Sequence, residues 1–258
     1  MEVDWKHLAQ KRIAELSSAM NLVPKLENIV NKEEPTLEDI LEVCSHDSRL
    51  LKKLMRRTGI DGSKEDFAKE VLFRKGVYFL KSLAIRTMNQ EIFEVPMPNS
   101  DLTPQRLKKR SVILARFIKV FVASLSEGGD NAYLCGLFYN FDYICYELIF
   151  NEVGEDAPIF DENLEFYGEL ASGAVGSLGF DPFVCNTLAE SKKELRATKH
   201  PIAQALLRIA NEALVNTEKT SSMLGRSTKF DQKLVDATGF PSSKILTVLK
   251  AVSRNYRT

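Results

Sequence analysis

"LCGLFYNFDYICYELIF" occupies residues 134–150 and is a mainly apolar stretch that contains Tyr139, Asn140 and Asp142. The stretch predicts a buried helix, because it is apolar on most sides and the chain shows no convincing period-two alternation typical of strands. Polar groups inside such a helix cost free energy unless they find partners. They mark either a functional site or core residues whose polar ends are satisfied by neighbours.

Helix signals continue along the rest of the chain. Thr36 and Ser63 precede apolar residues at helical spacing, and Thr103 precedes a proline at the first helical position. Prolines also follow Asp181 and His200, just inside two further helix starts. We therefore expect an all-α protein of about a dozen helices.

Three longer segments carry more specific expectations. Lys69–Met88 reads as one helix-like run, and Val112–Leu125 reads as a central buried helix. The last segment, Ser243–Asn255, has Ile245, Leu246 and Leu249 on one face. This amphipathic helix either docks a partner or closes the bundle.

The prolines of "EVPMPNSD", residues 94–101, mark the clearest linker in the chain. A chain of this length forms one large domain or two small ones. We expect a single domain of residues 1–258 with two helical lobes. Its parts are an N-terminal lobe at 1–95, a linker at 96–102, a second lobe at 103–218 and C-terminal helices at 219–258.

Composition narrows the class of protein. With 35 basic and 35 acidic residues, the net charge is zero, which disfavours a globally basic nucleic-acid-binding protein. No apolar run approaches the ~20 residues that span a bilayer, and the N-terminus lacks the apolar segment of a secretory signal. We therefore expect a cytoplasmic protein with no membrane segment.

The cysteines favour the same compartment. Cys44, Cys135, Cys145 and Cys185 form no CxxC pair, and each lies in an apolar, helix-like segment. Zinc-binding cysteines have much tighter spacing. We expect reduced, mostly buried thiols, with no metal and no cofactor.

Several segments match, in order, those of a known family. "LVPKL" at 22–26 precedes "LEDILEVCSHDSRLLKKLMRRTG" at 37–59, in which Asp47 lies between two helix-like segments, and "VLFRKGVYFLKSLAI" at 71–85 contains Gly76. Over residues 15–218 this order resembles the HDOD family, bacterial proteins related to HD-domain phosphohydrolases. Ser48 departs from the family's proline. The resemblance implies a multi-helix bundle whose second half is HD-like.

The second half of the chain resembles the part of HD enzymes that binds metal. "NAYLCGLFYNFDYICYELI" at 131–149 resembles the helix that supplies the His-Asp pair, and those places hold Tyr139 and Asn140. Asp142 falls where relatives carry glycine. By the same resemblance, Arg110 in "KKRSVILARF" replaces a metal-binding histidine and Asn211 in "ALLRIANEAL" replaces a metal-binding aspartate. The segment at 168–195 resembles a region with two further histidines and contains none.

Residue chemistry independently disfavours a metal centre. Such centres need several imidazoles and carboxylates that converge. The three histidines, His7, His46 and His200, lie in separate segments and read as loop or cap residues. We therefore expect no catalytic residues and no metal ligands.

The leading hypothesis is a non-catalytic HDOD-type module for regulation or signal transduction, which acts through a protein partner or a small ligand. One alternative is a divergent metal-dependent phosphohydrolase. The other is a ligand-sensing domain that binds a nucleotide or another small anion in a remnant pocket. Its candidate residues are Arg110, Tyr139, Asn140, Asp142 and Asn211. Asp142 has a simpler reading, in which it faces solvent or pairs with a basic residue such as Arg110.

Two basic clusters complete the sequence features. They are either solvated faces or docking sites for an acidic protein or a phosphate backbone. Little aromatic interleaving accompanies them, which disfavours stacking on single-stranded nucleic acid. The first cluster is Lys52, Lys53, Arg56 and Arg57, and the second is Arg106, Lys108, Lys109 and Arg110.

Overall fold

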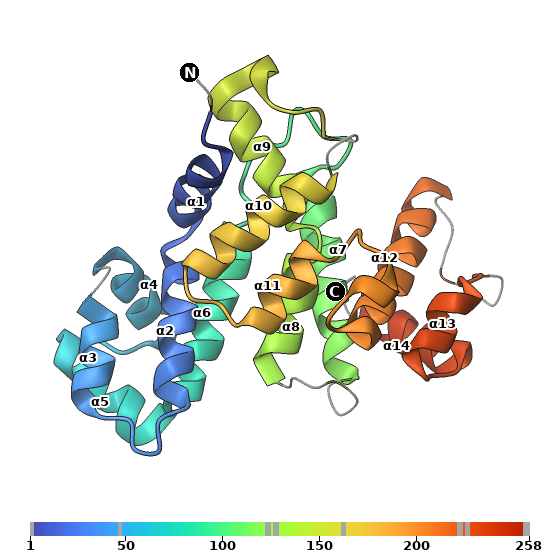
Figure 1. The fold of residues 1–258 in the computed structure, drawn as a ribbon. Coiled ribbons are helices and arrows are strands. Elements are labelled where there is room, and N and C mark those ends of the chain that lie inside the picture. Colours follow the sequence, from blue (N-terminus) through green and yellow to red (C-terminus); the bar gives the residue numbers. More distant parts are fainter. Residues whose placement is uncertain are drawn as a thin grey trace.

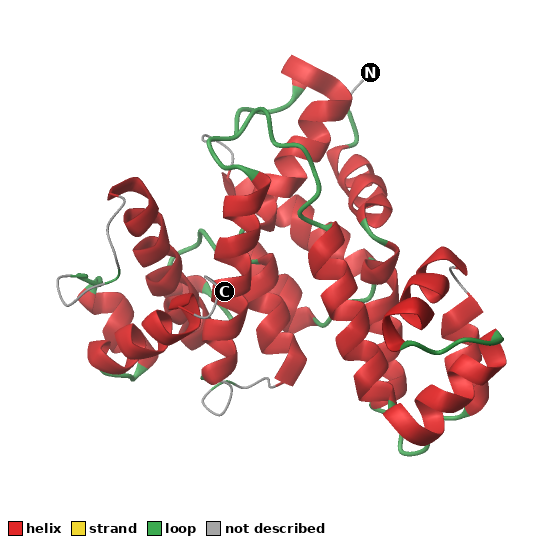
Figure 2. Ribbon diagram, turned by 180° about the vertical axis from the view of Figure 1, so that it is seen from behind, coloured by secondary structure: helices red, strands yellow, loops and turns green. Residues whose placement is uncertain are grey.

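A computed structural model describes residues 3–45, 48–121, 125, 129–160, 164–220, 224 and 228–254. Across these ranges the chain forms fourteen α-helices and no strand, which confirms the all-α prediction (Figures 1 and 2). None of the helices in these ranges combines the length and apolar character that crossing a membrane requires.

Six helices precede the proline-containing linker. The predicted capping residues begin two of them, because Thr36 Oγ1 accepts from Asp39 N at 3.2 Å and Ser63 Oγ accepts from Asp66 N at 3.1 Å. The six are α1 (Trp5–Leu16), α2 (Ser18–Val30), α3 (Leu37–Ser45), α4 (Ser48–Thr58), α5 (Lys64–Glu70) and α6 (Val77–Glu91).

Eight helices follow the linker. Thr103 and Asp181 cap two of them, each with proline at the first helical position, as predicted. The eight are α7 (Pro104–Val120), α8 (Gly129–Phe138), α9 (Phe141–Val153), α10 (Leu164–Ser177), α11 (Pro182–Ala189), α12 (Pro201–Thr220), α13 (Gln232–Thr238) and α14 (Ser242–Arg254).

The run predicted as one helix from Lys69 to Met88 is interrupted, so that prediction is wrong. A π-helical turn, Val71–Lys75, follows α5, and Gly76 ends it with a φ of 83°. The Gly76 N–H donates to Val71 O at 2.6 Å. Glycine adopts this left-handed region at little cost, so the chain changes direction here before α6.

The stretch at 134–150 also forms two helices where one was predicted. Helix α8 ends at Phe138 and α9 begins at Phe141, and Asn140 between them has a non-helical φ of −110° and ψ of 31°. Asparagine is a weak helix former because its side chain bonds readily outside the helix. Tyr139 and Asn140 therefore lie in a break inside the core.

The segment predicted as a central buried helix, Val112–Leu125, lies mostly in α7, which starts after the predicted cap Thr103. It begins at Pro104 and ends at Val120, before the predicted end at Leu125. Helix α8 crosses it closely at a glycine: a Cβ on Gly136 would lie 2.5 Å from the N and Cα atoms of Ala115. The two backbones are therefore in contact, and only glycine fits at this crossing.

Packing between the helices joins the segments before and after the linker. Helix α2 packs on α6, whereas α1 packs mainly on α9 and α10 (Figure 1). Helices α12 and α14 both pack on α7. The last helix buries Ile245 and Leu249 in the chain's own core, which favours the bundle-closing alternative. The division into two lobes stays a prediction, and α1 lies across its boundary.

The proline-containing linker is anchored to the core. Val95 and Met97 are buried, and three groups of the linker donate to the fully buried Glu147 carboxylate on α9. The donors are Asn99 N at 3.1 Å, Asn99 Nδ2 at 3.1 Å and Ser100 Oγ at 2.6 Å. This network holds the linker against α9 and shapes the neighbouring cavity.

Candidate functional site

The break between α8 and α9 places Asn140 against α12. Its Nδ2 donates to Asn211 Oδ1 at 3.1 Å. Asn140 is buried, and its own Oδ1 accepts no hydrogen bond from any described residue. Two of the five candidate residues are therefore in direct contact.

Tyr139 points toward the turn that follows α11. Its hydroxyl donates a long hydrogen bond of 3.5 Å to the Ser191 carbonyl. From α12, Arg208 Nη2 donates to the carbonyls of Glu190, at 3.0 Å, and Lys193. Burial raises the pKa of Tyr139, so its phenol is neutral at physiological pH.

Asp142 is fully buried in the first turn of α9 and does not face solvent. Lys192 Nζ lies 3.4 Å from its Oδ2, so the cationic partner is Lys192 and not Arg110. Burial raises the pKa of Asp142, and the Lys192 charge opposes that rise. This pair ties α9 to the same turn that Tyr139 and Arg208 contact.

Arg110 lies apart from the other four candidate residues. It is 5% exposed on α7, and its Nη2 donates to Glu218 Oε2 at 2.7 Å. Glu218 follows Asn211 by two turns of α12, a rise of about 10 Å along the axis. The five candidates therefore form one polar cluster, containing Tyr139, Asn140, Asp142 and Asn211, and a separate Arg110–Glu218 pair.

A cavity of about 590 Å³ adjoins this pair, between the linker, α7, α9 and α12. It is lined by three cations and by aromatic rings, with two carboxylates among them. Of the five candidate residues, only Arg110 is part of its lining. The residues that decide its chemistry are Asp101, Arg106, Arg110, Tyr143, Tyr146, Phe160, Glu218 and Lys219.

Within the described ranges, no three His, Cys, Asp or Glu side chains converge on a position that could hold a metal ion. His7 is exposed on α1, and His200 packs edge-on against Phe183, with 4.6 Å between ring centroids, just before α12. His46 and Asp47, which the resemblance to the family's central signature includes, lie outside the described residues.

The cysteines are free thiols, as predicted. Cys44, Cys135 and Cys145 are buried and Cys185 is partly buried. Burial raises the pKa of Cys44 to about 11 and that of Cys185 to about 11. Because the thiolate is the nucleophile, thiols with a raised pKa are poorly suited to covalent catalysis.

Three charged residues of these networks were missed by the sequence analysis: Lys192, Arg208 and Glu218. Two of them had an available signal. Arg208 and Glu218 lie three residues before and seven residues after Asn211 on α12, so helical periodicity places them on the same face. Lys192 belongs to a polar turn, and no local pattern distinguishes it from its neighbours.

Comparison of the chain with protein-family models, with curated proteins and with solved structures gave no match. The resemblance to the HDOD family therefore rests on the sequence patterns alone.

Proposed function

We propose that the chain is a non-catalytic, HDOD-type regulatory module that acts through a protein partner or a small ligand. The observation that carries the proposal is the 3.1 Å hydrogen bond between Asn140 and Asn211. By resemblance, both residues stand where HD enzymes have metal-binding aspartates. Neutral carboxamides lack the anionic oxygens that hold such metals, and these two are engaged with each other.

The surroundings support the same proposal. The Tyr139 hydroxyl contacts a backbone carbonyl, and Lys192 lies beside Asp142 as its counter-ion, so both side chains face other parts of the protein. Hydrolysis would require a nucleophile, a base and space for the substrate at one position. The cluster instead fastens α9, α12 and the turn after α11 to one another.

Metal analysis tests the proposal against the phosphohydrolase alternative. The chain is purified with Mn²⁺, Fe²⁺ or Zn²⁺ added, desalted and assayed for bound metal and for phosphoester hydrolysis. We expect less than about a tenth of an equivalent of metal and no turnover above background. Stoichiometric metal, together with turnover that Asn211→Ala abolishes, would establish the enzyme instead.

The cavity beside Arg110 favours a second candidate, a ligand-sensing domain. Arg110 Nε is buried and donates to no acceptor among the described residues, and the cavity wall contains the rings of Tyr143, Tyr146 and Phe160. A cation beside aromatic rings suits an anion that carries a planar ring, such as a nucleotide.

A thermal-shift screen with cyclic dinucleotides and guanosine polyphosphates tests this candidate. A ligand of the cavity should raise the unfolding midpoint, and Arg106→Ala and Arg110→Ala should each reduce the rise. Lys109→Ala is the matched control, because it removes the same charge from α7 outside the cavity. A shift that Arg110→Ala leaves unchanged places the ligand elsewhere.

A further inference from the structure

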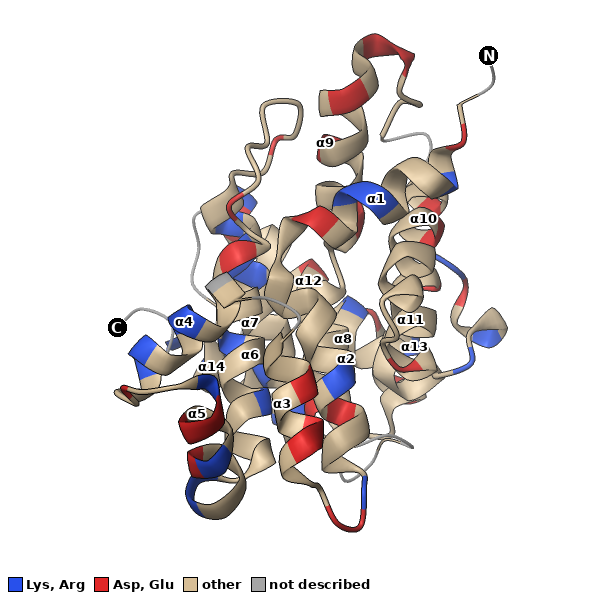
Figure 3. Cartoon of the chain, turned by 90° about the vertical axis from the view of Figure 1, so that its left-hand side faces the viewer, with Lys and Arg blue, Asp and Glu red and all other residues tan. Residues whose placement is uncertain are grey.

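The two basic clusters of the sequence converge on one cleft. Arg57 comes from the first cluster and Lys108 from the second, and Arg86 and Arg116 lie in the same cleft. It has a volume of about 500 Å³ and lies between α4, α6 and α7, a size typical of small-molecule sites. Figure 3 shows Lys and Arg positions on each of these three helices.

Helical spacing explains why the cations share the cleft. On α7, Lys108 and Arg116 are eight residues apart, so they lie on one face about 12 Å apart along the axis. On α6, Arg86 and Gln90 are four residues apart and also share a face. The cleft therefore presents positive charge along more than two helical turns.

None of the four cations forms an ion pair with a carboxylate in the part of the chain that the structure describes. Other cations on the same helices do: Lys53 on α4 pairs with Glu91 at 2.5 Å, and Lys119 on α7 pairs with Asp130 at 3.6 Å. Like charges gathered in a concave surface repel one another and focus a positive potential. An anion in the cleft would relieve this repulsion.

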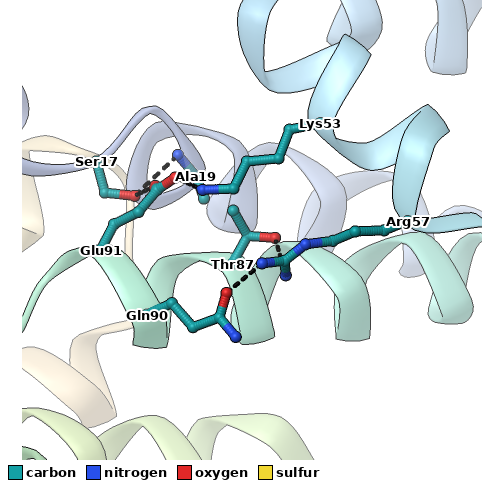
Figure 4. A network of polar contacts seen from close by, with 7 residues as sticks. All are labelled: Ser17, Ala19, Lys53, Arg57, Thr87, Gln90 and Glu91. Carbon is teal, nitrogen blue, oxygen red and sulfur yellow. Dashed lines mark hydrogen bonds and ion pairs between the residues drawn. The ribbon is translucent and has the colours of Figure 1, made fainter.

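Arg57 is held in place by neutral groups. Its Nη1 donates to Thr87 Oγ1 at 3.1 Å and its Nη2 donates to Gln90 Oε1 (Figure 4). These contacts orient the guanidinium without neutralising its charge. A cation fixed in this way binds an anion with less loss of side-chain entropy.

The remaining lining indicates the class of anion. The Asn89 and Gln90 carboxamides line the cleft, and no aromatic ring is part of its lining. Asn89 Oδ1 accepts no hydrogen bond from the described residues. Without a ring there is no platform for a base, so recognition falls on oxygens that carry negative charge.

We propose that the cleft of Arg57, Arg86, Lys108 and Arg116 binds a small anion that carries two or more phosphate groups. Lys108 and Arg116 are spaced by about 12 Å along α7, so linked phosphates can follow the row of cations and contact more of them than one phosphate can. Helices α4 and α6 precede the linker and α7 follows it, so the anion bridges the two parts of the chain. The site extends the proposed regulatory function and does not depend on it.

Calorimetric titration of the full chain at low salt tests the site with orthophosphate, pyrophosphate and tripolyphosphate. We expect affinity to increase with the number of phosphates and to fall as salt is added. Arg86→Ala and Arg116→Ala should each weaken tripolyphosphate binding about tenfold or more, since each removes a charged hydrogen-bond donor. Circular dichroism melts establish that both variants are folded.

Two control variants each remove one positive charge from a helix that borders the cleft. Arg56→Ala on α4 and Lys109→Ala on α7 should leave tripolyphosphate affinity within about twofold, because neither residue lines the cleft. Arg110→Ala should also leave it unchanged, which separates this site from the cavity beside Arg110. If the control variants lost as much tripolyphosphate affinity, general surface charge would account for the effect and the proposed site would be wrong.

Two further outcomes would overturn the proposal. One is the absence of tripolyphosphate binding at about 1 mM ligand in low salt. The other is a single-stranded oligonucleotide that displaces tripolyphosphate and depends on Arg86 and Arg116 more strongly, which would assign the cleft to nucleic acid. Metal analysis of the polar cluster is unaffected by either result.

Discussion

The polar cluster around Asn140 and the basic cleft between α4, α6 and α7 use polar residues in opposite ways. In the cluster, buried groups face one another: Asn140 bonds to Asn211, and Asp142 has Lys192. In the cleft, Arg86 and the other three cations have no carboxylate partner among the described residues. Buried polar groups that pair with one another join the elements of a fold, whereas unneutralised charge at a concave surface is available to a ligand.

The largest expected effect comes from the helix crossing that supports both regions. Gly136→Val would force a side chain into the Ala115 backbone, and we expect a loss of about 3 kcal/mol or more in the free energy of unfolding. Gly173→Ala in α10 is the control, since nothing lies within 4 Å of its Cβ position. Urea unfolding measures both, and the control should be neutral or slightly stabilising.

Lys192→Met should produce the next largest effect, because it leaves the buried Asp142 carboxylate without its counter-ion. We expect a loss of about 1–3 kcal/mol at neutral pH. The pKa of Asp142 is already raised in the folded state, so the protonated carboxyl contributes its full stabilisation at pH values below the pKa of the unfolded chain. That stabilisation is lost as the pH rises through the pKa of the folded state. The variant raises that pKa further.

The destabilisation by Lys192→Met should therefore shrink on acidification. Urea unfolding at about pH 7.5 and about pH 4.5 measures the change. A loss of equal size at both pH values would show that Lys192 stabilises the turn through packing rather than through the charge of Asp142.

Asp142→Asn tests the same ion pair by changing its acidic member. It keeps the shape of the side chain and removes the buried charge, so stability at neutral pH should be unchanged or higher by about 1 kcal/mol. The difference from the unmodified chain should vanish toward acidic pH, where Asp142 is protonated. A clear loss of stability at neutral pH would mean that the ion pair holds the cluster together.

The smallest effects should appear in the cleft. Arg86→Gln removes one of several like charges, so we expect the free energy of unfolding to stay unchanged or to rise by about 0.3 kcal/mol. Lys53→Gln on α4 is the matched case, because it breaks the ion pair with Glu91 and should cost about 0.2–1 kcal/mol. Thermal melts at low salt compare them. A greater loss for Arg86→Gln would make that arginine structural.

Local chemistry accounts for the features that the sequence predicted correctly. The helix starts at Thr36, Ser63 and Thr103 depend on residues within one turn, and the apolar faces depend on residues three and four apart. Composition and spacing were also sufficient to predict free, mostly buried cysteines. These features need no knowledge of distant parts of the chain.

The two wrong helix predictions have a different cause. Apolar periodicity continues through Gly76 and through Asn140, so the pattern shows no end there. The break at Gly76 depends on one backbone angle, and the break at Asn140 accompanies a bond to Asn211, 71 residues away. Periodicity reports which face is apolar and does not report such long-range contacts.

The sequence by itself determined the helical class and several helix starts. Only the tertiary structure decided that Asn140 meets Asn211, that Asp142 pairs with Lys192, and that Arg57 and Lys108 share a cleft. The physical reason is the separation along the sequence over which each interaction acts. Caps and periodic faces arise within a few residues, whereas the partner of a charge is set by how distant helices pack.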